Sequence, residues 1–236
     1  MTIALGMTIA GERQRHHSYV AHVRLAPCYH DSFSMLFCFF IARRQPELEP
    51  LAPGLVRHAD LVAATRLLPD NARLTPDLML EYNAVLRTAW ERATVLPVRF
   101  GDVFSGEEAL LQLLASRRGE LLEALDRLKG KAEMGLRVAI PAGVGASDRV
   151  AEITLACRPL DCWFEVQWNR AGEAVLELAH LIDRQEAGEY RRRAEPLQIE
   201  VSGPRPPVHF LPQFLRRPVE TERGVQRPRR RAAAAG

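Results

Sequence analysis

The sequence predicts an α+β fold with an antiparallel sheet in its second half. Two stretches, 75–93 and 105–130, carry apolar residues at helical spacing. Several segments after residue 131 alternate apolar and polar side chains, as half-buried strands do. A charged helical segment then separates two of these strands, which is typical of an α+β unit rather than a parallel sheet.

Composition limits the classes of protein to consider. The 236 residues are enough for one large domain or two small ones, and 47% hydrophobic with 26% charged residues is typical of a globular chain. A net charge of +3 calls for no polyanionic partner. The four cysteines form no C-x-x-C pair, which indicates reduced thiols in the cytosol.

The first fifty residues are hard to interpret, and we assign residues 1–50 to a poorly defined leader. Their histidines and Cys28 match no metal-binding spacing, so no metal site is expected. The apolar run from Phe33 to Ile41 is about half of what a bilayer span needs. We expect a buried strand or core helix there, and no membrane association. The proline-rich stretch 45–54 is a turn or linker.

The first clear helix begins at Thr75, a good N-cap, and Pro76 suits the first helical position. It is expected to end near Ala93. The following "VLPVRF" is predicted to be extended, on a sheet edge or in a buried connection, because Pro97 removes a backbone donor. Gly101 then permits a backbone angle or a close approach that a side chain would block.

The next helix is expected to start at a capping box formed by Ser105 and Glu108. Gly119 is expected to divide it, and Gly130 to end it. In the later segments, the spacing of apolar residues indicates which are strands and which are helices. A helix is expected to begin near Asp183. The predicted strands cover residues 131–140, 151–157, 162–168, 174–182 and 197–201, although the composition of 174–182 would also allow a helix.

Catalytic chemistry is hard to find. The chain has no phosphate-binding loop, no G-x-S-x-G and no H-E-x-x-H, so we expect no enzyme activity and no cofactor. Cys157 and Cys162 are interpreted as small core residues rather than a redox pair. His180 and His209 are interpreted as packed or hydrogen-bonded residues. An unrecognised enzyme would require a buried cleft with convergent polar groups.

Arg99 is the charged residue inside "VLPVRFG". We favour an internal pairing with a carboxylate such as Asp102 or Glu133, or with backbone carbonyls, over an anion site. The last residues, 213–236, are predicted to be a basic disordered tail. An alternative function is therefore a non-enzymatic module that contacts nucleic acid or an acidic partner through the tail arginines. We do not expect nucleic acid, because no stacking surface or DNA-binding motif accompanies them.

"TVLPVRFGDVFSGEEALLQLL…LLEALDRLKGKAEMGLRV", residues 94–138, resembles the central signature of the gas vesicle protein GvpL/GvpF family. "AVLELAHLIDRQEAGEYRRR" and "VSGPRPPVHF" are similar to its later segments. Arg205 and Val208 stand where the family prefers tryptophan and tyrosine, the helical insertion after the "E-x-G" strand is short, and the usual opening strand is not evident. The motif residues are Leu96, Pro97, Arg99, Phe100, Gly101, Phe104, Glu133, Gly135, Ser202, Gly203 and Pro204.

The resemblance implies an N-terminal α+β domain over residues 51–130, followed by a modified ferredoxin-like antiparallel-sheet domain over residues 131–212. It also implies a non-enzymatic role in gas vesicle formation, which gives cells buoyancy. The protein would be an accessory or minor structural component in the gas vesicle, within the cytoplasm. Its expected partners are other gas vesicle proteins, including the small hydrophobic shell protein.

Overall fold

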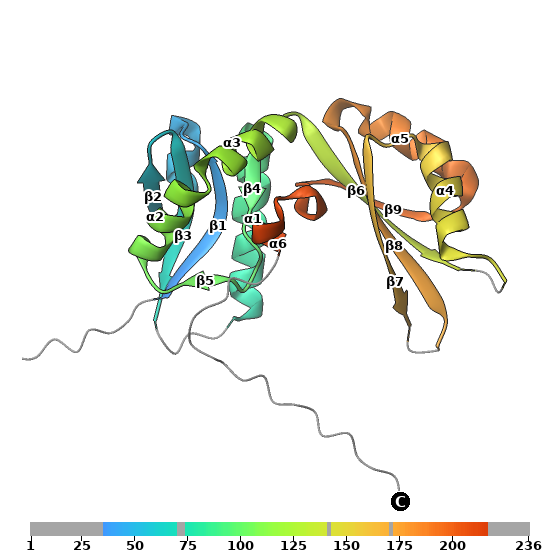
Figure 1. Ribbon diagram of the computed structural model, residues 1–236, viewed down its shortest axis with the longest axis horizontal. Coiled ribbons are helices and arrows are strands. Elements are labelled where there is room, and N and C mark those ends of the chain that lie inside the picture. The colour runs from blue at the N-terminus through green and yellow to red at the C-terminus, as the bar shows by residue number, and fades with distance from the viewer. Residues whose placement is uncertain (1–34, 70–73, 141–142, 170–171, 217–236) are drawn as a thin grey trace, which may run out of the picture. The chain divides into compact units, whose positions relative to one another are not determined.

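The computed structural model describes residues 35–69, 74–140, 143–169 and 172–216 (Figure 1). These residues form two antiparallel sheets, one with five strands and one with four. The α+β prediction is confirmed at this level. Within the described residues, no helix is both long enough and apolar enough to cross a membrane.

The first sheet is built around β1 (Met35–Arg43), whose central residues are buried throughout. It pairs with β3 (Leu61–Leu68) on one side and with β4 (Val95–Pro97) and β5 (Val103–Phe104) on the other, while β2 (Gly54–His58) adds to β3. A strand that is covered on both faces has a continuous run of apolar residues rather than alternating apolar and polar residues. This explains the sequence "LFCFFIA".

Helices cover both faces of this sheet. The apolar stripe of α1 (Pro76–Arg92), with Tyr82 and Leu86, packs into the same cluster as Phe37 of β1. Two further helices, α2 (Glu107–Ser116) and α3 (Arg118–Arg127), pack with Leu36 and Ile41. A register shift between Cys38 and Phe40 changes which residues of β1 point to each face. The 3-10 helix η1 (Pro46–Leu51) precedes β2.

The second sheet has the strand order β7-β8-β6-β9, with all neighbours antiparallel. Its strands are β6 (Lys131–Ala139), β7 (Asp161–Trp168), β8 (Ala174–Asp183) and β9 (Glu200–Arg205). Two helices, α4 (Ala146–Cys157) and α5 (Ala187–Ala194), lie on one face (Figure 1). The chain order is therefore β–α–β–β–α–β.

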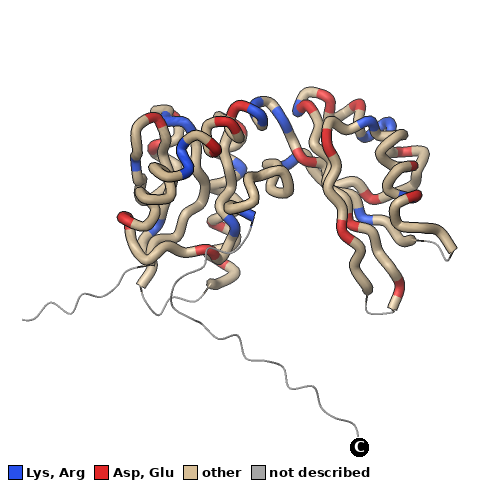
Figure 2. Tube along the Cα trace, viewed as in Figure 1, with Lys and Arg blue, Asp and Glu red and all other residues tan. Residues whose placement is uncertain are grey.

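Short helical turns complete the second half of the chain. The 3-10 helices η2 (Arg184–Glu186) and η3 (Glu195–Leu197) flank α5. After β9 come η4 (Val208–Phe210) and α6 (Gln213–Arg216), where Leu215 is buried. Both signs of charge are interspersed along the described chain, as expected from its small net charge (Figure 2).

Several local predictions are confirmed. Thr75 caps α1, since its hydroxyl accepts from the backbone N–H of Leu78 at 3.2 Å, and Pro76 is the first helical residue. β4, which contains Pro97, ends the strand order of its sheet, where a proline removes no internal ladder bond. Gly101 has φ +99° and is the third residue of the turn that the Asp102 N–H closes on the carbonyl oxygen of Arg99 at 3.1 Å.

Other local predictions are wrong. Residues 151–157 are not a strand: they belong to α4, whose buried residues Ile153 and Cys157 lie four apart, which also fits a helix. The expected Ser105–Glu108 capping box is absent, because Gly106 is the N-cap of α2 and no side chain caps it. The two helices are divided at Arg117 rather than at Gly119.

The outermost elements of the described chain also differ from expectation. β1 supplies an opening strand that the sequence did not make evident, so the first sheet includes residues that were assigned to the leader. α6 likewise occupies the first residues assigned to the tail. The rest of the leader and the arginine-rich tail lie outside the described residues, as does the cluster of N-terminal histidines.

Candidate functional site

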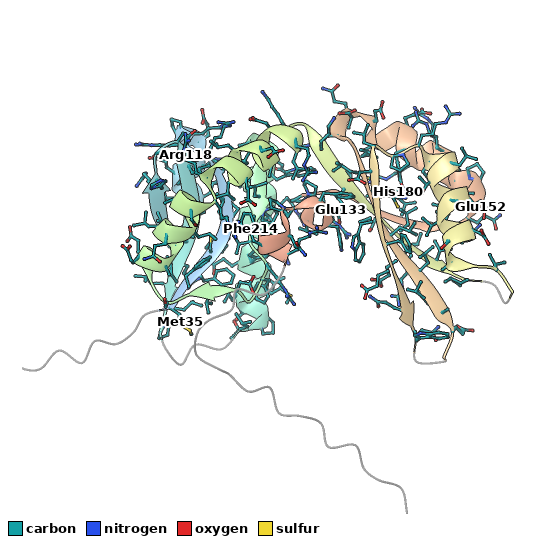
Figure 3. All side chains as sticks on the ribbon, viewed as in Figure 1. Met35, Arg118, Glu133, Glu152, His180 and Phe214 are labelled. Carbon is teal, nitrogen blue, oxygen red and sulfur yellow. The ribbon has the colours of Figure 1, made fainter. Side chains whose placement is uncertain are left out.

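Glu133 of β6 is a buried carboxylate on the sheet face opposite α4 and α5 (Figure 3). Its Oε1 accepts hydrogen bonds from Arg205 Nε at 2.9 Å and from His209 Nδ1 at 2.8 Å. Its Oε2 accepts from the backbone N–H of His209, also at 2.9 Å. The carboxylate therefore fixes both the end of β9 and the segment that follows it.

These contacts determine the charge state of Glu133. Burial alone would raise the pKa of its carboxyl group, because removal from water disfavours the charged form. The hydrogen bonds from His209 and the positive charge of Arg205 outweigh this effect, and the pKa lies below its usual range. Glu133 is therefore an ionised structural residue rather than a proton acceptor, because both carboxylate oxygens already accept hydrogen bonds.

Small residues make room for this arrangement. A Cβ on Gly135 would lie 2.7 Å from Ser202 Oγ and 2.9 Å from Arg205 Nη2. A Cβ on Gly203, where φ is +105°, would lie 2.7 Å from the carbonyl oxygen of Glu133. The Ser202 hydroxyl donates to the carbonyl oxygen of Gly135 at 3.2 Å, and Pro204 continues β9 to Arg205. The motif "E-x-G" on β6 and the motif "SGP" on β9 thus lie on paired strands and contact each other.

The imidazole of His209 also stacks on Trp163 of β7, with 4.2 Å between ring centroids and 29° between the planes. Stacking and hydrogen bonding together orient the ring. The interpretation of His209 as a hydrogen-bonded residue is confirmed. The same holds for His180, whose Nδ1 lies 2.7 Å from the hydroxyl of Tyr190 on the opposite face of the sheet.

The "VLPVRFG" motif is held by aromatic packing. Leu96 and Phe104 are buried with α2 and α3. Phe100 packs against Tyr82 at 5.5 Å between ring centroids, and the Tyr82 hydroxyl donates to the carbonyl oxygen of Val98 at 2.8 Å. The extended segment is therefore attached to α1 by one buried hydrogen bond and an edge-to-face aromatic contact.

Arg99 does not play the predicted role of an internal pair for Glu133, since Arg205 and His209 occupy that carboxylate. Its side chain is exposed. Among the described residues, none accepts a hydrogen bond from the Arg99 guanidinium. The prediction failed because the sequence offered no way to choose between Arg99 and Arg205 as partner of Glu133.

Both motif regions line one pocket of about 520 Å³. Arg99 and Phe100 come from the first motif, and Trp163, His209 and Arg216 from later segments. The lining is aromatic and apolar with positively charged groups, and it contains no carboxylate. The remaining lining residues are Tyr82, Pro97, Val208, Leu211, Gln213 and Leu215.

This lining suits binding better than catalysis. Guanidinium groups beside aromatic rings bind carboxylates and apolar side chains of a partner. No group of His, Cys, Asp and Glu side chains in the described part of the chain is arranged to hold a metal ion. The thiols of Cys157 and Cys162 are free, and burial raises the pKa of both.

Sequence reasoning missed Trp163, Arg205 and Arg216 as parts of the site. Arg205 was visible as a departure from the family pattern, but its partner was not. Trp163 lies on β7 with its ring on the face opposite the residues that seemed to define the strand. Arg216 was assigned to the tail, and only the position of α6 brings it to the pocket.

Comparison with crystal structures shows a shared fold. The gas vesicle protein GvpF from Anabaena sp. PCC7120 superposes with a TM-score of 0.60 at 14% identity, over 75% of this chain and 95% of that chain. GvpF from Microcystis aeruginosa gives a TM-score of 0.54 at 14% identity, over 75% of this chain and 98% of that chain. No curated protein matches the sequence.

The sequence itself matches a family model over residues 36–160, more than half of the chain. That stretch runs from β1 through "VLPVRFG" and the "E-x-G" strand to the start of β7. The chain belongs to the gas vesicle synthesis protein GvpL/GvpF family.

Proposed function

We propose that this protein is an accessory or minor structural component of the gas vesicle and acts by binding other gas vesicle proteins during shell assembly. Membership of the gas vesicle synthesis family carries this proposal. The small hydrophobic shell protein is the partner we expect, and the gas vesicle within the cytoplasm is the expected location. The role is non-enzymatic.

The pocket supports a binding role. Its exposed Arg99, with Phe100 and Trp163 beside it, offers a positively charged group next to aromatic surface. A shell subunit before assembly exposes apolar and strand-edge surface that needs a partner. We infer that the pocket receives an apolar segment of a vesicle protein whose carboxylate pairs with Arg99. The β–α–β–β–α–β unit that carries Trp163, and that His209 follows, is then a modified ferredoxin-like unit.

The first experiment is deletion of the gene in a host without a second family member, scored by electron microscopy. We expect few or misshapen vesicles, and restoration by the wild-type gene. Vesicles of normal number and shape in the deletion strain would overturn the proposal.

A second experiment tests the pocket. Arg99→Gln removes the exposed guanidinium, and Arg87→Gln on α1 is a matched control because Arg87 is also exposed and does not line the pocket. We expect Arg99→Gln, but not Arg87→Gln, to fail in restoring vesicles and in retaining the shell protein on a pull-down. Equal behaviour of the two variants would show that the pocket is not the binding surface.

A further inference from the structure

The edge strand β7 carries an unpaired row of backbone groups. In the described part of the chain, β7 pairs with β8 and with no other strand. A sheet edge of this kind is a template for pairing with a further strand. It lies outside the pocket proposed above, except for Trp163.

The hydrogen-bond pattern shows which residues of β7 face outward. The backbone N–H of Asn169 donates to the carbonyl oxygen of Glu173 at 3.0 Å, and the antiparallel register continues from there to Asp161. Bonded and non-bonded pairs alternate along such a ladder. The C=O groups of the outer edge therefore belong to Cys162, Phe164, Val166 and Trp168. Its free N–H groups belong to Phe164, Val166 and Trp168, because the N–H of Cys162 donates to Asp161 Oδ1 at 2.8 Å.

The side chains of the same residues are largely apolar and exposed. Phe164, Val166 and Trp168 are 44%, 37% and 73% exposed, and Leu160 just before the strand is exposed as well. They share the face of the sheet on which α4 lies, where Thr154 Oγ1 approaches Cys162 Sγ at 3.8 Å. Proteins usually protect an edge with charge on such positions. Here the edge and its apolar row coincide.

We propose that a second copy of this chain pairs with β7, antiparallel and with Phe164 at the two-fold axis. In this register Phe164 lies opposite Phe164 of the second copy. Val166 lies opposite Cys162, and Trp168 opposite Leu160. All apolar positions of the row are then paired with one another, and cross-strand pairs of this kind stabilise a sheet.

The charges on β7 support this register. With Phe164 at the axis, Asp161 lies opposite Gln167, and Glu165 lies opposite Trp163. A shift of the axis by one residue, to Trp163 or Glu165, places Asp161 opposite Glu165 or Glu165 opposite itself, and like charges directly opposite are unfavourable. A shift by two residues leaves one end of each strand without a partner. The axis at Phe164 uses the whole of β7 and gives a closed two-fold dimer.

The first test measures the oligomeric state of the purified full chain by sedimentation velocity over a dilution series. We expect a dimer that dissociates on dilution. Val166→Lys should leave a monomer, because it places a charge in the apolar row. Leu67→Lys on β3 is the matched control, since Leu67 is an apolar strand residue that is 69% exposed and belongs to the other sheet. Thermal unfolding by circular dichroism shows that both variants are folded.

The second test determines the register by disulfide formation. In a Cys162→Ser background, Phe164→Cys brings two thiols face to face across the axis, at a separation of paired residues that a disulfide can span. We expect a covalent dimer on mild oxidation. Trp168→Cys in the same background should remain uncrosslinked, because the two copies of residue 168 lie at opposite ends of the paired strands.

Three outcomes would overturn the inference. The first is a chain that is monomeric at every concentration, even if Val166→Lys then lowers binding of the shell protein, since the edge would belong to that partner. The second is a dimer that persists in Val166→Lys. The third is a dimer in which Trp168→Cys crosslinks as well as Phe164→Cys. None of these measurements depends on vesicle formation, so this inference and the proposed function fail separately.

Discussion

Arg205 and Glu133 form an ion pair with 2.8 Å between Nη2 and Oε1, although Glu133 is fully buried and Arg205 is partly exposed. The pair joins the last residue of β9 to β6. His209, which follows β9, adds two further hydrogen bonds to the same carboxylate. The buried Glu133 carboxylate therefore depends on Arg205 and His209 for the contacts that keep it ionised.

We expect Arg205→Ala to lower the free energy of unfolding by about 2 kcal/mol, because it leaves a buried carboxylate with fewer donors. Arg137→Ala on β6, the strand that carries Glu133, is the control. Arg137 is exposed and its ion pair with Glu177 is long, at 3.9 Å, so its removal should cost less than about 0.5 kcal/mol. Urea denaturation of the two variants measures the difference. Equal losses would mean that Arg205 contributes only as a surface charge.

Glu133→Gln tests the charge itself. Since the folded state lowers the pKa of Glu133, the carboxylate contributes stability that is present above its unfolded pKa of about 4.3 and is lost as pH falls through the folded value. The variant should therefore be less stable than the wild type at pH 7, and the gap should narrow as the solution becomes more acidic. Urea denaturation at several pH values checks this, and a gap that stays constant with pH would contradict it.

The sequence predicted the elements of this fold better than their contacts. Thr75, Pro76 and the stripe of α1 are local signals, and they placed that helix correctly. The prediction of a strand at residues 151–157 was wrong because the apolar residues of "AEITLAC" fit the two-residue repeat of a strand and the repeat of a helix equally well. β1 was hard to assign because a strand buried on both faces shows no alternation.

The candidate site was predictable only in part. Its glycines and prolines were identified because backbone geometry restricts those residues, as Gly101 and Gly203 with positive φ show. The partners of Glu133 were not identified, because they lie more than seventy residues away and several arginines were equally plausible. Long-range pairing of charges depends on the folded arrangement, which local patterns do not specify.

Protonation of His180 should give the stability of the protein a second dependence on pH. Burial lowers the pKa of its imidazole to about 4, so the folded protein keeps the ring neutral while the unfolded chain takes up a proton near pH 6.5. Stability should fall as pH decreases from 6.5 towards 4, by up to roughly 3 kcal/mol. His180→Leu should flatten this part of the stability profile, measured by urea denaturation. An unchanged slope would show that the ring is accessible to protons in the folded state.

Gly135→Ala tests the close approach of β9 to β6. The added methyl group would meet Ser202 Oγ at 2.7 Å, so β9 or the Arg205 side chain must shift. We expect a loss of about 1–3 kcal/mol in the free energy of unfolding, as for other overpacked sites. Gly188→Ala in α5 is the matched control, because a Cβ there meets nothing within 4 Å. That variant should lose no stability, because alanine has the better helix propensity.

Tyr82→Phe tests the attachment of the "VLPVRFG" segment to α1. It removes the hydroxyl that donates to the carbonyl oxygen of Val98 at 2.8 Å while it keeps the ring contacts with Phe37 and Phe100. A buried carbonyl oxygen without a donor costs about 1–2 kcal/mol, and we expect a loss of stability of that size. Because Val98 precedes Arg99, the loss of this bond should also loosen the backbone that presents Arg99 to the pocket. Hydrogen exchange of the amides around Val98 should then increase, while exchange in β6 stays unchanged. If stability falls but the amides around Val98 exchange no faster than in the wild type, the Tyr82–Val98 hydrogen bond stabilises the core as a whole and does not position the "VLPVRFG" segment.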